Sequence, residues 1–246
     1  MAPEGPAGEE RETLRTLLDS LRLRLALSER PERYFRYGKD EVGGDTERHP
    51  SFETPKAEGE TLEEIAAEAA RCSLCPLHAT RTSVVFGEGN PRARLVFVGE
   101  APGADEDRQG RPFVGRAGQL LTRIIEAMKL KREDVYICNI LKCRPPGNRD
   151  PRGEEIAACE PYLMRQLAAI GPEVICALGT FAARTLLKTE APITVLRGRF
   201  HSYQGVPLMP TYHPAYLLRN PEAKKQVWED VRKIMEVLKD KKGVRM

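Results

Sequence analysis

The stretch R-L-V-F-V-G-E-A-P-G-A-D-E-D, residues 94–107, decides the fold. Its first half is a short apolar run with β-branched residues, which is typical of a buried strand. Its second half holds two glycines, a proline and four acidic residues. Glycine and proline suit a tight turn that brings the backbone close to a ligand, and an acidic surface turn is the alternative. No G-K-[S/T] follows, so the turn is not a Walker phosphate loop.

Three further apolar runs alternate with helical stretches along the chain. The strand-like runs cover 134–139, 173–179 and 207–213, and the helical patterns lie near 61–71, 116–129, 153–169, 180–188 and 221–239. Alternation of strands and helices indicates an α/β domain in layers. We therefore expect a four-stranded, mainly parallel central sheet.

The first sixty residues differ in pattern from the remainder. Leucines within 9–30 fall on one helical face, and Pro31 is expected to end that helix. Residues 38–60 are rich in glycine, proline, threonine and charge, which indicates a linker. We expect residues 1–60 to form an N-terminal helix with a flexible linker, and residues 61–246 to form one globular domain.

Charge is divided unevenly between these two parts. Residues 1–60 carry a net charge of −4 and the remaining 186 residues carry +7. A basic body suits a polyanionic partner such as nucleic acid, although surplus lysine and arginine also occur on ordinary solvated surfaces. The N-terminal helix either packs against the body or, as the alternative, binds a protein partner through residues 1–30.

The apolar runs and the N-terminal residues indicate where in the cell the protein is found. No apolar run approaches the ~18 residues of a membrane span. The acidic start M-A-P-E-G-P lacks the basic and apolar regions of a signal peptide. We expect no membrane and a cytoplasmic location, where clustered cysteines indicate metal binding or catalysis more than disulfides.

Three of the four predicted strands end on polar residues able to do chemistry. The first runs into Glu100, the second ends at Asn139 and the fourth ends at His213, whereas the third ends in Gly179 and Thr180. Ligands of such sheets bind beyond the carboxyl ends of the strands. Three different polar ends converging on one sheet edge predict a site there.

Two loops add possible contacts to this edge. In R-P-F-V-G-R-A-G-Q-L-L (111–121), Phe113 sits among glycines and arginines, where it either stacks on a base or packs under the loop. In H-P-A-Y-L-L-R-N (213–220), Leu217 and Leu218 are either helix-core residues or exposed wedges for a nucleic-acid stack.

Four of the six cysteines have the spacing C-x2-C…C-x15-C. They are Cys72, Cys75, Cys143 and Cys159. Four thiolates fit either tetrahedral zinc or an iron–sulfur cluster, and the spacing does not decide between the two. His78 replacing one cysteine is a further alternative. The other two cysteines lie inside apolar strands, where free cysteine behaves as a small buried apolar residue.

Taken together, these motifs resemble one known family. The motifs are C-S-L-C-P-L, G-E-A-P-G-A-D-E-D, R-P-F-V-G-R-A-G-Q-L-L, N-I-L-K-C-R-P-P-G-N-R-D-P, A-A-C and H-P-A-Y-L-L-R. In this order and spacing, residues from about 61 to 240 are similar to the family 4 uracil-DNA glycosylases. The resemblance implies a three-layer α/β/α sandwich, and a [4Fe–4S] cluster on the four cysteines rather than zinc.

The resemblance also implies residue roles. Glu100, Asn139 and His213 are expected to be catalytic. The uracil pocket is expected to be formed by Gly99, Ala101, Gly103, Glu106, Phe113, Asn139 and His213. DNA is expected to contact Arg144, Arg149, Leu217, Leu218 and Arg219.

The implied activity is removal of uracil from single- and double-stranded DNA by a monomeric, monofunctional hydrolase of the N-glycosidic bond. The alternatives are a non-catalytic, cluster-bearing nucleic-acid-binding module on the same fold, and an electron-transfer protein. Neither alternative accounts for three different polar residues at successive strand ends.

Overall fold

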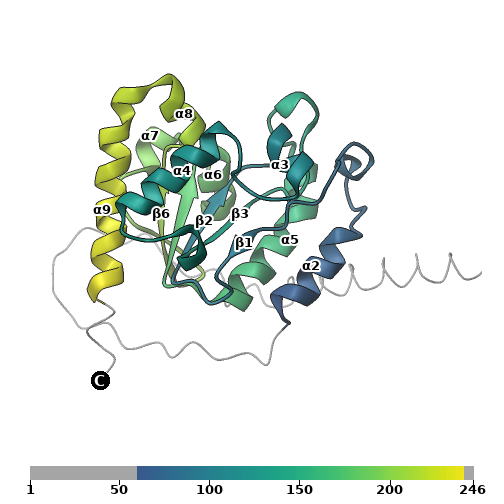
Figure 1. The fold of residues 1–246 in the computed structure, drawn as a ribbon, viewed down its shortest axis with the longest axis horizontal. Coiled ribbons are helices and arrows are strands. Elements are labelled where there is room, and N and C mark those ends of the chain that lie inside the picture. Colours follow the sequence, from purple (N-terminus) through teal and green to yellow (C-terminus); the bar gives the residue numbers. More distant parts are fainter. Residues whose placement is uncertain (1–59, 241–246) are drawn as a thin grey trace, which may run out of the picture. The chain divides into compact units, whose positions relative to one another are not determined.

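A computed structural model describes residues 60–240, and their core is a six-stranded sheet in the order β1-β3-β2-β4-β6-β5 (Figure 1). The strands are β1 (Glu88–Gly89), β2 (Leu95–Gly99), β3 (Tyr136–Asn139), β4 (Val174–Leu178), β5 (His201–Tyr203) and β6 (Val206–Thr211). The four central strands run parallel, and β1 and β5 pair antiparallel at the two edges. Polar side chains that follow the central strands therefore meet at one edge.

The expected number of four strands is wrong, because the sheet has six. The four predicted runs are the four central strands, so the parallel core of the prediction is confirmed. The two edge strands have two and three residues, too few for an alternating pattern to stand out in the sequence.

Helices cover both faces of the sheet, which confirms the layered α/β prediction (Figure 1). They are α2 (Leu62–Ala70), α3 (Ala104–Gln109), α4 (Arg116–Ala127), α5 (Gly153–Ile170), α6 (Thr180–Leu187), α7 (Ile193–Leu196), α8 (Pro214–Arg219) and α9 (Lys224–Asp240). Short 3-10 turns cover Pro76–Ala79, Arg132–Asp134, Pro146–Asn148 and Pro221–Ala223. The helices α3, α7 and α8 have only four to six residues; α3 and α7 were not predicted from the sequence, and α8 agrees with the helix-core alternative for Leu217.

Side chains alternate between the two faces along β2. Val96 and Val98 enter the core that α5 and α6 cover, whereas Leu95 and Phe97 enter the core that α4, α8 and α9 cover. Both sets are buried, because a parallel sheet has helices on both faces and neither face is left to water. The apolar run at 94–99 is continuous for this reason.

The helix predicted near 61–71 is confirmed as α2. Thr61 accepts a hydrogen bond from the Glu64 amide at 3.2 Å, and the Thr61 amide donates to the Glu64 carboxylate at 2.7 Å. This reciprocal capping box satisfies two of the amides left free at a helix start. The helix packs on α5, and Arg165 of α5 forms an ion pair with Glu68 at 2.5 Å. The C-x2-C motif is thereby fixed beside α5.

The helix predicted within 9–30 and the linker predicted at 38–60 lie outside the described residues, apart from residue 60 itself. Across residues 60–240, none of the helices combines the length and the apolar character that crossing a membrane requires.

Candidate active site

The carboxyl edge of the sheet holds all three predicted strand-end residues. Glu100 follows β2 directly, Asn139 is the last residue of β3, and His213 lies two residues beyond β6. Gly99 and Asn139 are register partners on neighbouring parallel strands. The sheet therefore places the three residues at the same edge.

Asn139 points its amide toward Gly99 and Phe113. A Cβ atom placed on Gly99 would lie 2.4 Å from Asn139 Oδ1 and 2.5 Å from Phe113 Cζ, so only glycine fits between them. Asn139 is 1% exposed, and its Oδ1 has no hydrogen-bond partner within the described chain. A buried amide oxygen without a partner costs about 1–3 kcal/mol, so this atom is set up to receive a donor from a ligand.

Phe113 is held in a backbone conformation that phenylalanine rarely adopts, with φ at +52°. Arg132 donates to the carbonyl oxygens of Phe113 at 3.2 Å and Pro112 at 2.8 Å, and it pairs with Glu88 at 2.6 Å. At Gly118 in α4, a Cβ atom would lie 1.8 Å from the Phe113 carbonyl oxygen. The glycine and the arginine together fix the ring, which is 6% exposed.

His213 completes this group, because its ring centroid lies 5.6 Å from that of Phe113. Gly179 allows the close approach of β4, since a Cβ atom there would lie 3.0 Å from His213 Cβ. The Ala215 amide donates to His213 Nδ1 at 3.1 Å, so the proton of the neutral ring sits on Nε2. Burial, aided by the positive charge of Arg219, lowers the pKa of His213 to about 4. Near neutral pH the ring is an uncharged Nε2–H donor.

Glu100 is partly buried at the exit of β2. Burial, with a smaller contribution from the negative charge of Asp150, raises the pKa of Glu100 to about 7. A carboxyl group with a pKa near the working pH accepts and returns a proton readily. Sequence reasoning did not single out Asp150, which lies in the loop after Asn148.

Glu106 ties two loops together. One carboxylate oxygen accepts hydrogen bonds from the amides of Val114 and Gly115, both at 2.9 Å, and the other accepts from the Gly103 amide at 3.1 Å. Both oxygens are thus engaged by backbone. Glu106 connects the turn after β2 to the Phe113 loop, and Ala101 lies within that same turn.

The two leucines predicted to probe DNA differ in exposure. Leu217 is 1% exposed and belongs to the core beneath α4 and α9, so its assignment as a DNA-contacting wedge is wrong. Leu218 is 37% exposed and Arg219 is also exposed. Helix α8 turns one leucine inward and its neighbour outward, as successive helical residues point about 100° apart.

The two arginines of the loop after Cys143 both have partners in the chain. Arg149 binds the buried carboxylate of Glu155 at 2.5 Å and 2.9 Å, so its guanidinium is committed within the protein. Arg144 donates to the exposed side chain of Asn148 at 2.8 Å. Of these two arginines, Arg144 is the freer to contact a phosphate.

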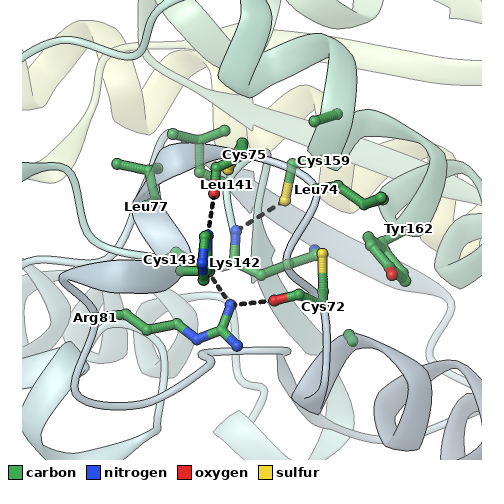
Figure 2. Close-up of a pocket in the computed structure, with 13 residues that line it drawn as sticks. Cys72, Leu74, Cys75, Leu77, Arg81, Leu141, Lys142, Cys143, Cys159 and Tyr162 are labelled. Atoms are coloured by element: carbon green, nitrogen blue, oxygen red, sulfur yellow. Dashed lines mark hydrogen bonds between the residues drawn. The ribbon is translucent and has the colours of Figure 1, made fainter. Parts of the chain in front are cut away.

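The four spaced cysteines line one hollow between α2, α5 and the loop after β3 (Figure 2). Cys143 and Cys159 are buried, whereas Cys72 and Cys75 are partly exposed. His78 also lines the hollow, but its Nδ1 lies 2.8 Å from the Cys75 carbonyl oxygen and is engaged there. The four thiols predicted to act together are thus brought together.

Two basic residues donate hydrogen bonds to these sulfurs (Figure 2). Arg81 Nη1 lies 3.3 Å from Cys143 Sγ and 2.8 Å from the Cys72 carbonyl oxygen. The Lys142 amide donates to Cys159 Sγ at 3.2 Å. Donors aimed at sulfur stabilise thiolates, which are the metal-binding form of cysteine.

The chemistry of the hollow is set by its four thiols. Within residues 60–240, no three Cys, His, Asp or Glu side chains form a group that would hold a single metal ion. The four thiols line one shared hollow, together with Arg81, Lys142 and Tyr162. Four thiols around a hollow, with N–H donors to two of them, fit the ligand set of an iron–sulfur cluster.

Sequence reasoning missed several residues that support this site. Lys142 is 2% exposed and Gln166 is fully buried, yet both residue types are usually found on surfaces. Arg132 lies within K-L-K-R-E-D (129–134), a charged segment of the kind usually found on the surface. The only signal in the sequence was the position of Lys142, between the strand ending at Asn139 and Cys143.

Comparison with known proteins agrees with this geometry. Residues 86–232 match the model of the uracil DNA glycosylase superfamily. A type-4 uracil-DNA glycosylase of Thermotoga maritima is 48% identical over 184 residues, which are 73% of this chain and 96% of the relative. A type-4 enzyme of Saccharolobus solfataricus is 46% identical over 191 residues, 74% of this chain and 88% of the relative. A type-5 enzyme of Pyrobaculum aerophilum is 34% identical over 146 residues, 52% and 64% of the two chains. The chain therefore belongs to the uracil DNA glycosylase superfamily, in its family 4.

Proposed function

We propose that the protein is a DNA-repair enzyme that removes uracil from DNA by hydrolysing its N-glycosidic bond. The observation that carries this proposal is the buried Asn139 amide, whose Oδ1 has no partner and lies against Gly99 and Phe113. The family membership and the names of the type-4 relatives support the same activity.

Recognition rests on the pattern of donors and acceptors around the base. The target nucleotide leaves the stack, at a cost of a few kcal/mol, and its base enters the pocket beside Phe113. Asn139 Oδ1 accepts from uracil N3–H, and the amide N–H donates to O4. Cytosine presents the reverse pattern, so it would leave buried polar groups unpaired at about 1–3 kcal/mol each.

Departure of the base requires stabilisation of negative charge. The C1′–N1 bond breaks with its electron pair moving onto uracil, largely to O2 and N1. The neutral His213 ring has its proton on Nε2, and this N–H donates toward O2 as an oxyanion hole does. Because the pKa of His213 is about 4, the ring donates as an uncharged group throughout the physiological range.

Glu100 is proposed to act on the sugar and on the attacking water. Its carboxylate stabilises the positive charge that develops on the sugar and positions the water whose oxygen bonds to C1′. The water proton passes to Glu100 or to solvent, and the uracil anion is protonated after release. A pKa of about 7 keeps enough carboxylate present at neutral pH for this role.

Further residues are assigned by position. Gly99, Ala101 and Gly103 form the backbone wall of the pocket, and Glu106 holds that wall against the Phe113 loop, where it restricts the space for the methyl group of thymine. Leu218, Arg219 and Arg144 contact the DNA strand, and Arg149 supports the same loop through Glu155.

Cys72, Cys75, Cys143 and Cys159 would hold a [4Fe–4S] cluster with a structural role. Such a cluster fixes the loop after β3 to the start of the domain, without taking part in bond cleavage. We also propose that the enzyme is a cytoplasmic monomer acting on single- and double-stranded DNA, and that residues 1–30 bind a protein partner.

The test is incubation with uracil-containing single- and double-stranded oligonucleotides, followed by alkali and electrophoresis. Strand breaks at the uracil position are expected, with a loss of about 10²–10³-fold in rate for Asn139→Ala. Asn90→Ala, at the opposite end of the sheet beside the start of β3, is the matched control. Binding without strand breaks would favour the non-catalytic module.

A further inference from the structure

A buried lysine lies between the uracil pocket and the four cysteines. Lys142 is 2% exposed, follows Asn139 by three residues and directly precedes Cys143. Lysine is almost never buried unless its ammonium group is partnered, because removing that charge from water is costly. Neither recognition of the base nor binding of the cluster, as described above, uses this side chain.

The backbone from Asn139 to Lys142 connects three parts of the site. The Ile140 amide donates to the Gly99 carbonyl oxygen and the Leu141 amide to the Glu100 carbonyl oxygen, both at 3.0 Å. The next amide, that of Lys142, donates to Cys159 Sγ at 3.2 Å. Three consecutive N–H groups thus tie the loop to the β2 exit and then to a cysteine of the cluster site.

The Lys142 side chain folds back over this loop. Its Nζ donates to the Asn139 carbonyl oxygen at 2.8 Å and to the Gln166 side-chain oxygen, and lies 5.8 Å from the centre of the Phe86 ring. The Gln166 amide is itself fixed, since its nitrogen donates to the Phe86 carbonyl oxygen at 3.0 Å. The buried Lys142 ammonium group therefore holds the last residue of β3 through its carbonyl oxygen.

Both hydrogen-bond acceptors of the ammonium group are uncharged. A buried charge among neutral acceptors gains from an anion nearby. Thiolates at Cys143 and Cys159 would supply negative charge on the same loop and on the helix packed against it. Lys142 therefore contacts both a cysteine of the cluster site, through its backbone amide, and Asn139, through its ammonium group.

We propose that Lys142 is a positioning residue that couples the iron–sulfur cluster to Asn139, so that cluster binding sets the uracil-reading amide. This inference rests on the proposed function. The path runs from the Cys159 sulfur to the Lys142 backbone amide, and from the Lys142 ammonium group to the Asn139 carbonyl oxygen. Lys239, an exposed lysine of α9, is the comparison residue.

The experiment is a double-mutant cycle on the cluster-loaded protein, using Lys142→Met and Asn139→Ala. Methionine keeps the length and apolar stem of lysine and removes the ammonium group. We expect Lys142→Met to lower the single-turnover rate of uracil release by about 10-fold. In the Asn139→Ala background the same change should cost less than about twofold, because the residue it positions is absent.

Two further measurements separate positioning from loss of structure. Iron content and visible absorbance per chain should stay at the wild-type level in Lys142→Met. Its affinity should fall for a duplex with 2′-fluoro-2′-deoxyuridine, which resists cleavage, and remain unchanged for a duplex with a tetrahydrofuran abasic site. Lys239→Met, the same change at an exposed position of α9, should leave the iron content and both affinities at the wild-type level.

The coupling is overturned if Lys142→Met lowers the single-turnover rate equally with and without the Asn139 side chain, or does not lower it at all. It is also overturned if Lys142→Met weakens binding of the uracil analogue and of the abasic duplex equally. If Lys142→Met does not fold, Gln166→Met, which removes the second acceptor of the ammonium group, must show the same dependence on Asn139. Uracil release by the wild type separates the two proposals. An inactive wild type refutes the glycosylase, whereas an active wild type with additive variants refutes only the coupling.

Discussion

Gly99 lies so close to Asn139 that the absent side chain of one residue makes room for the amide of the other. A Cβ atom on Gly99 would come within 2.4 Å of Asn139 Oδ1. Its backbone is otherwise ordinary for a strand, so glycine is needed here for space and not for conformation. The position of the Asn139 amide therefore depends on the absence of a Cβ atom at Gly99 of β2.

Gly99→Ala should reduce kcat/KM for uracil release by at least about 10²-fold, because the methyl group must displace the Asn139 amide or the Phe113 ring. The measurement is steady-state release from a uracil oligonucleotide. Gly153→Ala is the matched control, since a Cβ atom there meets nothing within 4 Å. An active Gly99→Ala enzyme would show that the pocket is assembled elsewhere.

Activity should rise with pH through about 7. Glu100 acts as a carboxylate, and its pKa of about 7 means that the active form is lost as the pH falls below that value. Protonation of His213 adds a second loss near pH 4, its own pKa. Single-turnover rates between pH 4 and 9 test this, and Glu100→Gln should give a low rate without the step near 7. A wild-type rate independent of pH from 5 to 9 would exclude Glu100 as the titrating group.

Glu100 should also destabilise the folded protein at alkaline pH. Its folded pKa of about 7 exceeds the ordinary value of 4.5, so the folded state holds its proton more tightly than the unfolded state. The tighter proton binding contributes fully to the free energy of unfolding below pH 4.5, and this contribution is lost as the pH rises through about 7. Glu100→Gln should therefore raise Tm by about 2–4 °C at pH 8, a shift near 1 kcal/mol after discounting for partial exposure, and leave it unchanged at pH 4.5. Equal shifts at both pH values would contradict this origin.

Removing one cluster cysteine should remove the cluster. Cys159→Ser is expected to abolish bound iron and visible absorbance and to lower Tm by at least about 5 °C, because a group that binds only the folded chain stabilises it. Cys176→Ala, on the opposite face of the sheet, is the control and should keep its iron. Full iron content in Cys159→Ser would place the fourth ligand elsewhere.

The two leucines of α8 should separate stability from DNA contact. Leu217→Ala should cost about 2–5 kcal/mol of unfolding free energy, because it opens a cavity in the core. Leu218→Ala should change stability by less than about 0.5 kcal/mol and slow release from duplex DNA more than from single strands. Urea denaturation and paired oligonucleotide assays measure the two effects. Equal rates on both substrates for Leu218→Ala would remove it from the DNA-binding surface.

Strand-end chemistry could be predicted from the sequence because it follows from topology. Four apolar runs specify four buried parallel strands, and parallel strands end at one edge, so Asn139 and His213 lie at the same edge of the sheet. The spacing of the cysteines was equally informative, since Cys143 begins a loop and Cys159 lies on the helix that follows it.

Burial of polar residues could not be predicted in the same way. Lys142 and Glu106 are residues of ordinary surface type, and their partners come from segments distant in sequence. The same limit applies to Leu217 and Leu218, which differ only in the rotation of a six-residue helix. Tertiary contacts decide such cases, and one sequence does not contain them explicitly.

The Phe113 loop carries a constraint on how the sequence can evolve. The ring keeps its left-handed backbone only while Gly118 leaves space for its carbonyl oxygen and Arg132 binds that oxygen. Neither supporting residue belongs to the base-contacting set proposed above, yet a change at either would disturb the ring. We expect these three positions to vary together or not at all among descendants of this chain, as a single inherited unit.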